Sequence, residues 1–350
     1  MLFQQQNILT SDPPLIIQRY QLMPYNVRLK TPWQTAAATL FFRQGLLVKL
    51  SINESLFAIG ECAPMEEIGT ESLAQAQQFL DKKLSSISGK AIDLQLLSDM
   101  DLFPACRFAL ETAFLSLMAQ HKQTSITHLL NPERSNTSSE VKVNAMLGSL
   151  NKDLLLIATQ AEAQGFKCLK IKVGLDTIKH EAEILKHLLQ QIAPSTLIRL
   201  DANKSWSCKE TEWLLNFLKP YENQIDSIEE PLKIFDQIAY QYLQNMTNIN
   251  LALDESVTLS SINKLPVKQL VLKPMAWGGI IKPFKLARQA QQSKIKTVIT
   301  SSIETAHGLW PIVHLCAAIN NEQFHGLATA AWLEDTLTEP PEINHGIITV

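Results

Sequence analysis

Short apolar runs recur through the later part of the chain, and a stretch with helical character follows each of them. The runs are largely apolar throughout, which is typical of strands buried on both faces of a parallel sheet. A spacing of roughly 20–30 residues between runs fits the strand–helix units of a barrel. We therefore predict an α/β fold built around a (β/α)8-type barrel. The predicted strands are Val141–Leu147, Cys168–Val173, Thr196–Leu200, Ser227–Ile228, Asn250–Leu253, Gln269–Leu272, Lys296–Ile299 and, weakly, Gln323–Leu327.

The first 125 residues follow a different pattern, which favours an α+β capping domain. Its predicted strands are Leu15–Tyr25, Leu46–Ile52 and Leu56–Glu61, and its predicted helices are Ser72–Leu84 and Pro104–Met118. We assign residues 1–125 to this domain and residues 126–334 to the barrel, and we expect the tail 335–350 to return to the capping domain. Arg28–Thr35 is interpreted as a mobile loop that orders over the barrel mouth when ligand binds.

Composition and charge exclude several classes of protein. The 350 residues are 46% hydrophobic and 19% charged, as expected of a globular chain. A net charge of −3 with scattered Lys and Arg argues against a nucleic-acid partner. The sequence lacks a long apolar run and a signal peptide, so we expect a cytoplasmic protein without membrane insertion. The five cysteines form no CxxC motif, which predicts free thiols. The sequence leaves the oligomeric state open.

Charged side chains stand at the ends of five neighbouring predicted strands. In a closed parallel barrel the C-terminal ends of all strands converge on one mouth, so these side chains are expected to face the same opening. From the second strand to the sixth they are Lys170 and Lys172, Asp201, Glu229, Asp254 and Lys273.

The three carboxylates predict a metal site. Neighbouring carboxylates repel one another unless a cation joins them. Ligands that offer only oxygen favour a hard ion, so we expect Mg²⁺, with Mn²⁺ able to substitute. Lys170 and Lys172 are two residues apart on a strand and should point the same way. One ammonium lowers the pKa of a second one nearby, which favours its use as a base.

This combination of groups suits removal of a proton next to a carboxylate. The metal would bind the carboxylate of a small-molecule substrate, and a lysine would remove the α-proton. The metal and the lysine on the opposite side would then stabilise the resulting enediolate. A barrel that binds a small acid without catalysis is an alternative, but buried charges kept without a function are costly.

The barrel also carries short motifs in a fixed order. They are KIKVG, LDANKSW, IEEPL, LALDES, LVLKPMAWGG, TSSIETAHGL and HGLATAAWL. Together they resemble the motifs of o-succinylbenzoate synthases, a family of the enolase superfamily, in which a lysine base acts with Mg²⁺. The earlier GECAP at Gly60–Pro64 resembles the end of that family's capping-domain sheet.

The resemblance implies a reaction and a role for each residue. The reaction is Mg²⁺-dependent syn dehydration of 2-succinyl-6-hydroxy-2,4-cyclohexadiene-1-carboxylate to o-succinylbenzoate, in menaquinone or phylloquinone biosynthesis. The implied base is Lys172, and the implied cation on the opposite face is Lys273. The implied metal ligands are Asp201, Glu229 and Asp254, and the auxiliary residues are Lys170, Arg199 and Asn203. The implied substrate contacts are Thr300, Ser301, Ser302, Ile303, Gly326 and Leu327.

Two other activities on the same scaffold stay open. Relatives that racemise N-acylamino acids or cycloisomerise muconate share these lysines and ligands. The segment Ala328–Ala330 lacks the paired aspartates with which dipeptide epimerases hold an amino group, and this absence favours the synthase.

Overall fold

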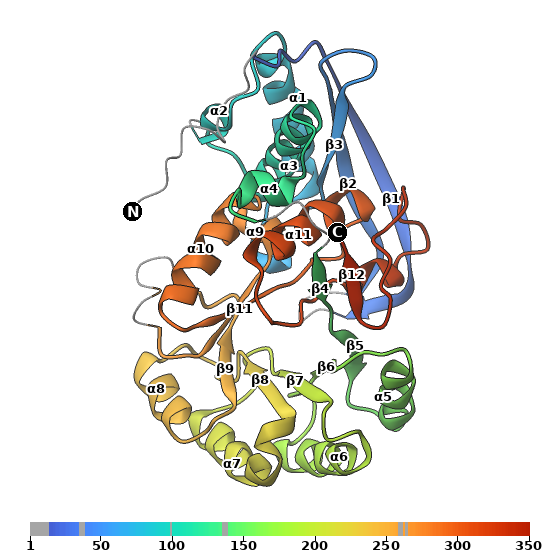
Figure 1. Cartoon of the computed structure of the whole chain (residues 1–350). Helices are drawn as coiled ribbons and strands as arrows, with labels where there is room; N and C mark the ends of the chain where they lie inside the picture. Colours follow the sequence, from blue (N-terminus) through green and yellow to red (C-terminus); the bar gives the residue numbers. More distant parts are fainter. Residues whose placement is uncertain (1–13, 35–38, 99, 135–138, 258–261, 263–264) are drawn as a thin grey trace.

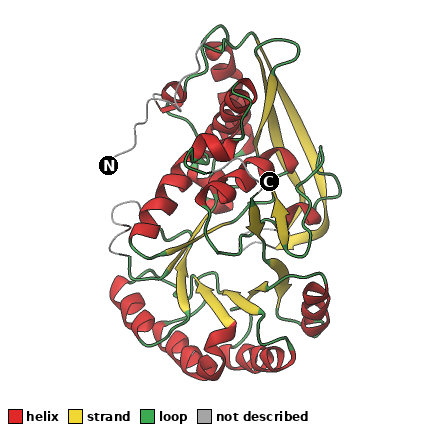
Figure 2. Ribbon diagram, in the orientation of Figure 1, coloured by secondary structure: helices red, strands yellow, loops and turns green. Residues whose placement is uncertain are grey.

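The structure, a computed structural model, describes residues 14–34, 39–98, 100–134, 139–257, 262 and 265–350. An antiparallel sheet with several helices forms the upper part of the molecule in Figure 1, and a curved parallel sheet forms the lower part. Figure 2 shows that the helices of the lower part surround the strands on the outside. The predicted α/β barrel with an α+β capping domain is confirmed.

The capping part contains a three-stranded antiparallel sheet in the order β1-β2-β3. Its elements are β1 (Arg19–Gln34), β2 (Thr39–Ser51), β3 (Phe57–Cys62), η2 (Glu66–Ile68), α1 (Leu73–Ile87), α2 (Leu94–Ser98), α3 (Pro104–His121) and α4 (Ile126–Leu130). A capping box between Ser72 and Gln75 starts α1, and Pro104 occupies the first turn of α3. These local signals explain why both helices begin within a residue of their predicted starts.

Seven parallel strands form the barrel sheet, and they follow one another in chain order. They are β5 (Ala145–Ser149), β6 (Cys168–Lys172), β7 (Leu197–Asp201), β8 (Ile225–Glu229), β9 (Asn250–Leu253), β10 (Gln269–Leu272) and β11 (Lys296–Ile299). The helices between and after them are α5 (Leu154–Ala163), α6 (Ile178–Gln191), α7 (Cys208–Leu218), η3 (Lys219–Gln224), α8 (Gln237–Asn245), α9 (Pro274–Trp277), α10 (Ile281–Gln292) and α11 (Ala306–Ile319). Every residue of β9 and β10 is buried, as expected of strands covered on both faces.

The eighth strand is reduced to two bridging residues. His325 forms a parallel bridge with Val143, and Gly326 forms one with Thr300. The segment thus closes the ring between the first and seventh strands. The prediction of a weak strand at Gln323–Leu327 is right in place, but it does not form a regular strand. The short 3-10 helix η5 (Ala328–Trp332) follows where an eighth unit would have an α-helix.

The predicted first strand is divided into two. β4 (Glu140–Lys142) pairs antiparallel with β12 (Ile347–Thr349), whereas β5 pairs with β6. The C-terminal tail therefore forms its strand pair with the segment that leads into the barrel. The assignment of residues 335–350 to the capping domain stays a prediction. The boundary at residue 125 stays a prediction.

Residues 28–34 form the end of β1, so the prediction of a mobile loop is wrong for them. β1 continues its pairing with β2 after a register shift between Arg28 and Trp33. The ring centroids of Trp33 and Trp332 lie 4.1 Å apart, which packs this hairpin end against η5. Thr35, the last residue of the predicted loop, lies outside the described residues.

Buried carboxylates join the capping part to the barrel at the N-termini of α11 and α10, which lie between the two parts in Figure 1. Glu61 of β3 is fully buried and accepts hydrogen bonds from the backbone N–H groups of Thr305 at 3.0 Å and Gly308 at 2.8 Å. The Tyr25 hydroxyl donates to the same carboxylate at 2.5 Å. The first N–H groups of a helix have no partner within it, so an anionic acceptor there stabilises the joint.

Glu111 of α3 does the same for α10. Its Oε1 accepts from the backbone N–H groups of Ile280 at 2.6 Å and Ile281 at 2.9 Å. Gly279 leaves the room for this carboxylate, because a Cβ at that position would collide with it. Gly308 leaves similar room for Glu61, whose Oε2 would lie 2.8 Å from an added Cβ.

We expect Glu61→Ala to lower the free energy of unfolding by roughly 3–5 kcal/mol, because it leaves buried N–H donors without an acceptor. Urea unfolding followed by circular dichroism measures the change. Glu66→Ala, at an exposed position nearby, is the control and should stay within about 0.5 kcal/mol of the parent. Equal effects of the two substitutions would contradict a structural role for the Glu61 cap.

Candidate active site

The ends of β6, β7 and β8 bring an ammonium and two carboxylates into direct contact. Lys170 Nζ lies 2.8 Å from Asp201 Oδ2 and 2.7 Å from Glu229 Oε2. The strand register places Asp201 beside Glu229 and explains this meeting. Burial alone would lower the pKa of Lys170, but the two carboxylates outweigh burial and raise it. Lys170 is therefore held as a cation between two of the predicted ligands.

A second lysine–carboxylate group lies across the mouth. Lys273 follows β10 and contacts the carboxylate of Asp254, and its Nζ lies 3.1 Å from Glu255 Oε1. Burial would lower the pKa of Lys273, but Asp254 and Glu255 outweigh it and raise the pKa. This lysine is also held as a cation.

Lys172 differs from both of these lysines. It ends β6, its backbone pairs with Asp201, and it is half-buried. Within the described part of the chain, its ammonium has no ion pair or hydrogen bond. Of the three lysines at the mouth, Lys172 is thus the one whose nitrogen is free to approach a ligand.

The three predicted ligands fit a hard divalent ion in donor type and charge. Asp201, Glu229 and Asp254 offer only carboxylate oxygens, and Glu229 and Asp254 are just 2% and 7% exposed. In the described residues their oxygens do not all lie within 4.8 Å of one another. Lys170 instead contacts Asp201 and Glu229, and Lys273 contacts Asp254.

A tighter group of potential ligands lies in the capping part, but it serves another purpose. Cys62, Glu71 and Cys106 bring ligand atoms within 4.8 Å of one another and are all buried. Both oxygens of Glu71 accept backbone N–H groups in the first turn of α3, from Ala105 and Cys106. The carboxylate is thus engaged as a helix cap. All five cysteines are free, as predicted.

Asn203 orients the first ligand. Its side-chain Nδ2 donates to Asp201 Oδ1 at 2.9 Å, and its backbone N–H donates to the same oxygen at 3.3 Å. Asn203 and Lys204 have φ values of +43° and +62°, which turn the chain sharply after β7. Asparagine is among the few residues that tolerate this conformation.

Arg199 does not reach the mouth. Its guanidinium is buried below it and binds Asp226 Oδ2 at 2.7 Å, Asn144 Oδ1 at 3.1 Å and the Phe324 carbonyl at 3.0 Å. It thus ties β7 to the segments that close the barrel. Burial, with this guanidinium nearby, lowers the pKa of His325 to about 3, so this histidine is neutral. None of these three partners is a proposed site residue, so the implied auxiliary role of Arg199 stays a prediction.

The segment after β11 brings several of the implied substrate contacts together. Thr300 Oγ1 lies 3.3 Å from the Gly326 carbonyl oxygen. A side chain at position 326 would collide with the Thr300 hydroxyl. The Ser301 hydroxyl bonds to that of Thr329, a partner that the sequence reasoning missed. The Ser302 hydroxyl is buried and has no hydrogen-bond partner in the described structure.

Two implied contacts point elsewhere. Ile303 packs with Val27, Leu29 and Leu333 in the cluster beneath the β1–β2 hairpin. Leu327 is fully buried in the main hydrophobic core. Their side chains therefore serve packing, and only their backbone is available to a ligand.

Glu304 is a buried acid that the sequence reasoning did not select. Its Oε2 accepts the Ser302 N–H at 2.6 Å, and its Oε1 has no partner in the described structure. Burial and the neighbouring Glu61 raise its pKa to about 7, against the opposing effect of Arg43. The Glu in TSSIETAHGL was visible in the sequence, but its burial depends on contacts with the capping part.

Glu304 should make stability depend on pH. The pKa of Glu304 in the folded protein lies above the value of about 4.3 in the unfolded chain. Protonation of Glu304 therefore contributes fully to the free energy of unfolding below about pH 4.3. This contribution is lost as the pH rises through 7. Between pH 5 and pH 8 the unfolding free energy of the parent should fall by about 2–3 kcal/mol relative to Glu304→Gln. Urea unfolding at both pH values tests this, and an unchanged difference would refute it.

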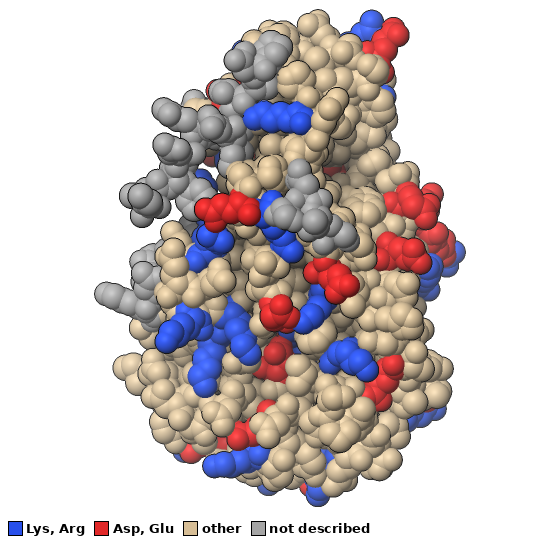
Figure 3. All heavy atoms as spheres, viewed as in Figure 1, with Lys and Arg blue, Asp and Glu red and all other residues tan. Residues whose placement is uncertain are grey.

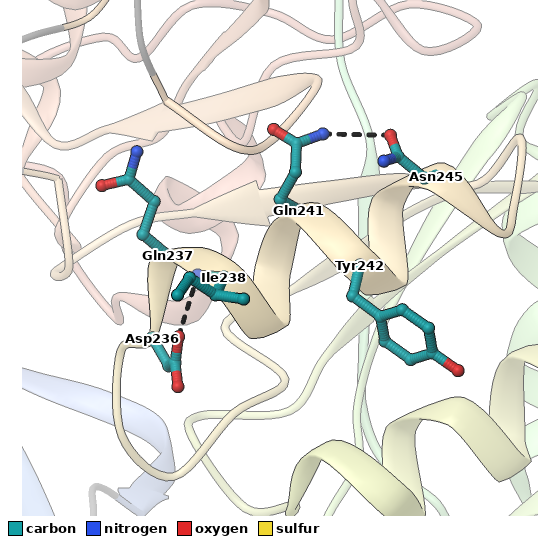
Figure 4. Close-up of a pocket in the computed structure, with 6 residues that line it drawn as sticks. All are labelled: Asp236, Gln237, Ile238, Gln241, Tyr242 and Asn245. Atoms are coloured by element: carbon teal, nitrogen blue, oxygen red, sulfur yellow. Dashed lines mark hydrogen bonds between the residues drawn. The ribbon is translucent and has the colours of Figure 1, made fainter.

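Acidic and basic side chains are interspersed among uncharged ones on the face that Figure 3 shows. A hollow on α8, outside the barrel, is lined by Asp236, Gln237, Ile238, Gln241, Tyr242 and Asn245 (Figure 4). Asp236 accepts the N–H of Ile238, and Gln241 donates to Asn245. No helix in the described structure is long and apolar enough to cross a bilayer.

Comparison with known proteins identifies relatives of both parts. Residues 155–350 match the family described as Enolase C-terminal domain-like, and residues 17–117 match the family described as MenC, N-terminal domain. The o-succinylbenzoate synthases of Yersinia pseudotuberculosis and Yersinia pestis are each 31% identical to the chain over 303 residues. These alignments cover 85% of this chain and 86% of each relative.

Solved structures share the fold at lower identity. The L-Ala-D/L-Glu epimerase from Bacillus subtilis has a TM-score of 0.85 at 21% identity, over 96% of both chains. The dipeptide epimerase from Enterococcus faecalis, complexed with Mg and a dipeptide, has a TM-score of 0.82 at 24% identity, over 95% of this chain and 96% of that one. Muconate lactonizing enzyme from Pseudomonas fluorescens has a TM-score of 0.81 at 17% identity, over 96% of this chain and 94% of that one. These structures show the shared fold, whereas the two family matches and the Yersinia relatives show that the chain belongs to the o-succinylbenzoate synthase family of the enolase superfamily and is a lyase.

Proposed function

We propose that the chain catalyses the syn dehydration of 2-succinyl-6-hydroxy-2,4-cyclohexadiene-1-carboxylate to o-succinylbenzoate, a step of menaquinone or phylloquinone biosynthesis. The observation that carries the proposal is the unequal state of the lysines at the mouth. Lys172 is free among the described residues, whereas Lys273 is held as a cation by Asp254 and Glu255. One base and one fixed cation are what a syn elimination requires.

Asp201, Glu229 and Asp254 would hold Mg²⁺, or Mn²⁺ in its place, through their carboxylate oxygens. When bound, the ion supplies positive charge that stabilises negative charge on the substrate carboxylate as the α-proton leaves. The same ion would relieve the repulsion among the carboxylates, a task that Lys170 and Lys273 share in the structure described here.

Lys172 Nζ removes the proton from the carbon that bears the carboxylate. The ring carbon–oxygen bond then breaks, and Lys172 returns the proton to the departing hydroxyl group, which leaves as water. A ring double bond forms and the product is aromatic, so the elimination is strongly downhill. Lys273 remains protonated and lies beside the developing enediolate, where its charge stabilises the transition state.

The segment Thr300–Ser302 and the backbone of Gly326 and Leu327 would hold the succinyl carboxylate. The free hydroxyl of Ser302 supports this assignment, since it is a buried donor without a partner in the described structure. The backbone N–H of Ser302 is engaged with Glu304, so the hydroxyl rather than the amide is the available donor.

Racemisation of N-acylamino acids is the second candidate. The observation in its favour is that lysines stand at the ends of β6 and β10, on two sides of the same mouth. Racemisation needs both lysines as acid and base, whereas Lys273 contacts two carboxylates and is held as a cation. That environment disfavours the neutral amine that Lys273 would need in order to act as a base.

The decisive experiment is an absorbance assay of the purified protein with the cyclohexadiene substrate. We expect turnover with Mg²⁺ or Mn²⁺, complete loss after exhaustive chelation, and recovery when either ion is added back. Full turnover in metal-free protein would overturn the metal assignment. Absence of turnover with either ion, in protein that racemises N-acylamino acids, would favour the second candidate.

A further inference from the structure

Glu230 occupies an unusual position at the end of β8. It follows Glu229 directly, is only 1% exposed, and has a φ of +43°. A left-handed backbone costs a non-glycine residue about 1 kcal/mol or more, so it persists where other interactions fix it.

The carboxylate binds the turn that follows β9. Its Oε1 accepts the backbone N–H groups of Asp254 and Ser256, each at 2.8 Å, and its Oε2 accepts the Ser256 hydroxyl at 2.8 Å. The backbone of Glu230 adds two more links. Its N–H donates to the Ala252 carbonyl at 2.9 Å, and its carbonyl accepts from the backbone N–H of Lys204 at 2.6 Å.

Glu229 and Glu230 thus act in different directions. The Glu229 side chain meets Lys170 at the mouth, whereas the Glu230 side chain reaches across to the next strand end. Asp254, the third ligand in the proposed function, lies in β9's exit turn, which contains little regular structure of its own. The Asp254 N–H donates to Glu230, and the Asp254 carbonyl accepts from the Val257 N–H at 3.2 Å.

We propose that Glu230 is a positioning residue, whose carboxylate sets the Asp254–Ser256 turn so that Asp254 can bind a divalent cation together with Asp201 and Glu229. The inference rests on the proposed function, because it assigns Asp254 as a ligand. Glu230 itself touches neither the cation nor the substrate. Its contribution depends on the reach of its side chain and on acceptor geometry, and depends little on its charge.

Glu181 provides a matched comparison elsewhere on the mouth. Its buried carboxylate accepts three consecutive backbone N–H groups in the turn after β6, from Gly174 at 2.7 Å, Leu175 at 2.9 Å and Asp176 at 3.2 Å. Glu181 therefore fixes the backbone of a turn, as Glu230 does, but this turn contains none of the proposed metal ligands. The same substitution at the two positions separates a local effect on metal binding from general loss of stability.

The test is Mn²⁺ binding to the full chain, measured by electron paramagnetic resonance of free Mn²⁺, with circular dichroism to verify folding. Glu230→Asp shortens the side chain by one methylene and should weaken Mn²⁺ binding by about tenfold or more. Glu230→Gln keeps the length, and its amide oxygen can accept both N–H groups, so its affinity should stay within about threefold of the parent. Glu181→Asp should leave affinity within about twofold.

Each outcome bears on the proposal. Parent affinity in Glu230→Asp overturns the positioning role while leaving the proposed function intact. Equal weakening in Glu230→Gln and Glu230→Asp also overturns it, since a side chain of the original length would then fail to preserve the affinity. If Glu181→Asp weakens binding as much as Glu230→Asp, the effect is general instability. A parent protein that binds no Mn²⁺ refutes the metal part of the proposed function and, with it, this inference.

Discussion

Lys172→Ala should abolish dehydration, with a loss of at least the roughly 10²–10⁴-fold that a general base contributes. Lys172 would both remove the α-proton and return it to the departing hydroxyl, so no second group in the proposed mechanism can replace it. The absorbance assay with saturating Mg²⁺ measures the loss. Lys179→Ala, at an exposed position on α6, is the control and should keep parent activity.

The same substitution should leave the protein folded, because Lys172 has no ionic partner within the described residues. Removal of the Lys172 side chain leaves no buried carboxylate without its ionic partner. We therefore expect the unfolding free energy to change by less than about 1 kcal/mol. Lys170→Ala, in contrast, leaves Asp201 and Glu229 without their ammonium. Substantial dehydration by folded Lys172→Ala would show that another group is the base.

Lys273→Arg should separate the two candidate reactions. Arginine keeps the positive charge next to Asp254 and Glu255, but it does not deprotonate in proteins. We expect measurable dehydration to remain, because this reaction requires only the positive charge of Lys273. The rate should be lower than that of the parent because the guanidinium is larger than an ammonium group. Any racemisation of N-acylamino acids should be lost, since it needs a proton transfer from that face.

Two measurements on this variant decide the assignment. The absorbance assay follows dehydration, and proton NMR in D₂O follows exchange and inversion at the α-carbon of an N-acylamino acid. The parent protein, run in parallel, gives the reference for both. Normal racemisation in Lys273→Arg with dehydration gone would show that the two lysines have been assigned the wrong roles.

The barrel could be predicted because its signals are local. Largely apolar runs such as Asn250–Leu253 and Gln269–Leu272 coincide with β9 and β10, since strands buried on both faces are mostly apolar. The charged groups at the mouth follow from the same fact. A charged residue just after such a run must lie where the parallel strands end, and the ends of all strands converge.

The hairpin was missed because its stability comes from a distant part of the chain. Pro32 and the polar residues around it resemble a loop locally, and proline disfavours regular strand pairing. The contact of Trp33 with Trp332, and the backbone bridge between Leu29 and Leu333, bring together residues about 300 positions apart. No local pattern reports such contacts.

The site was predicted in outline but not in detail, for a similar reason. The β8 register shifts between the partners of Ile198 and Arg199, and Asp226 binds the guanidinium of Arg199 below the mouth. Asp226 is the residue that the strand register skips, and the sequence pattern does not reveal its contact with Arg199. The burial of Glu304 likewise depends on Glu61, which lies in the other part of the molecule.

The glutamates that cap α10 and α11 also limit how the molecule can be divided or recombined. A barrel produced without its first 125 residues would lose Glu61 and Glu111, and with them the acceptors at both helix N-termini. An exchange of capping domains between relatives would have to transfer each glutamate together with a facing glycine, Gly308 or Gly279. We expect fragments and chimaeras that separate these pairs to be recovered mainly as aggregates. Engineering of this fold should therefore treat the two parts as one unit.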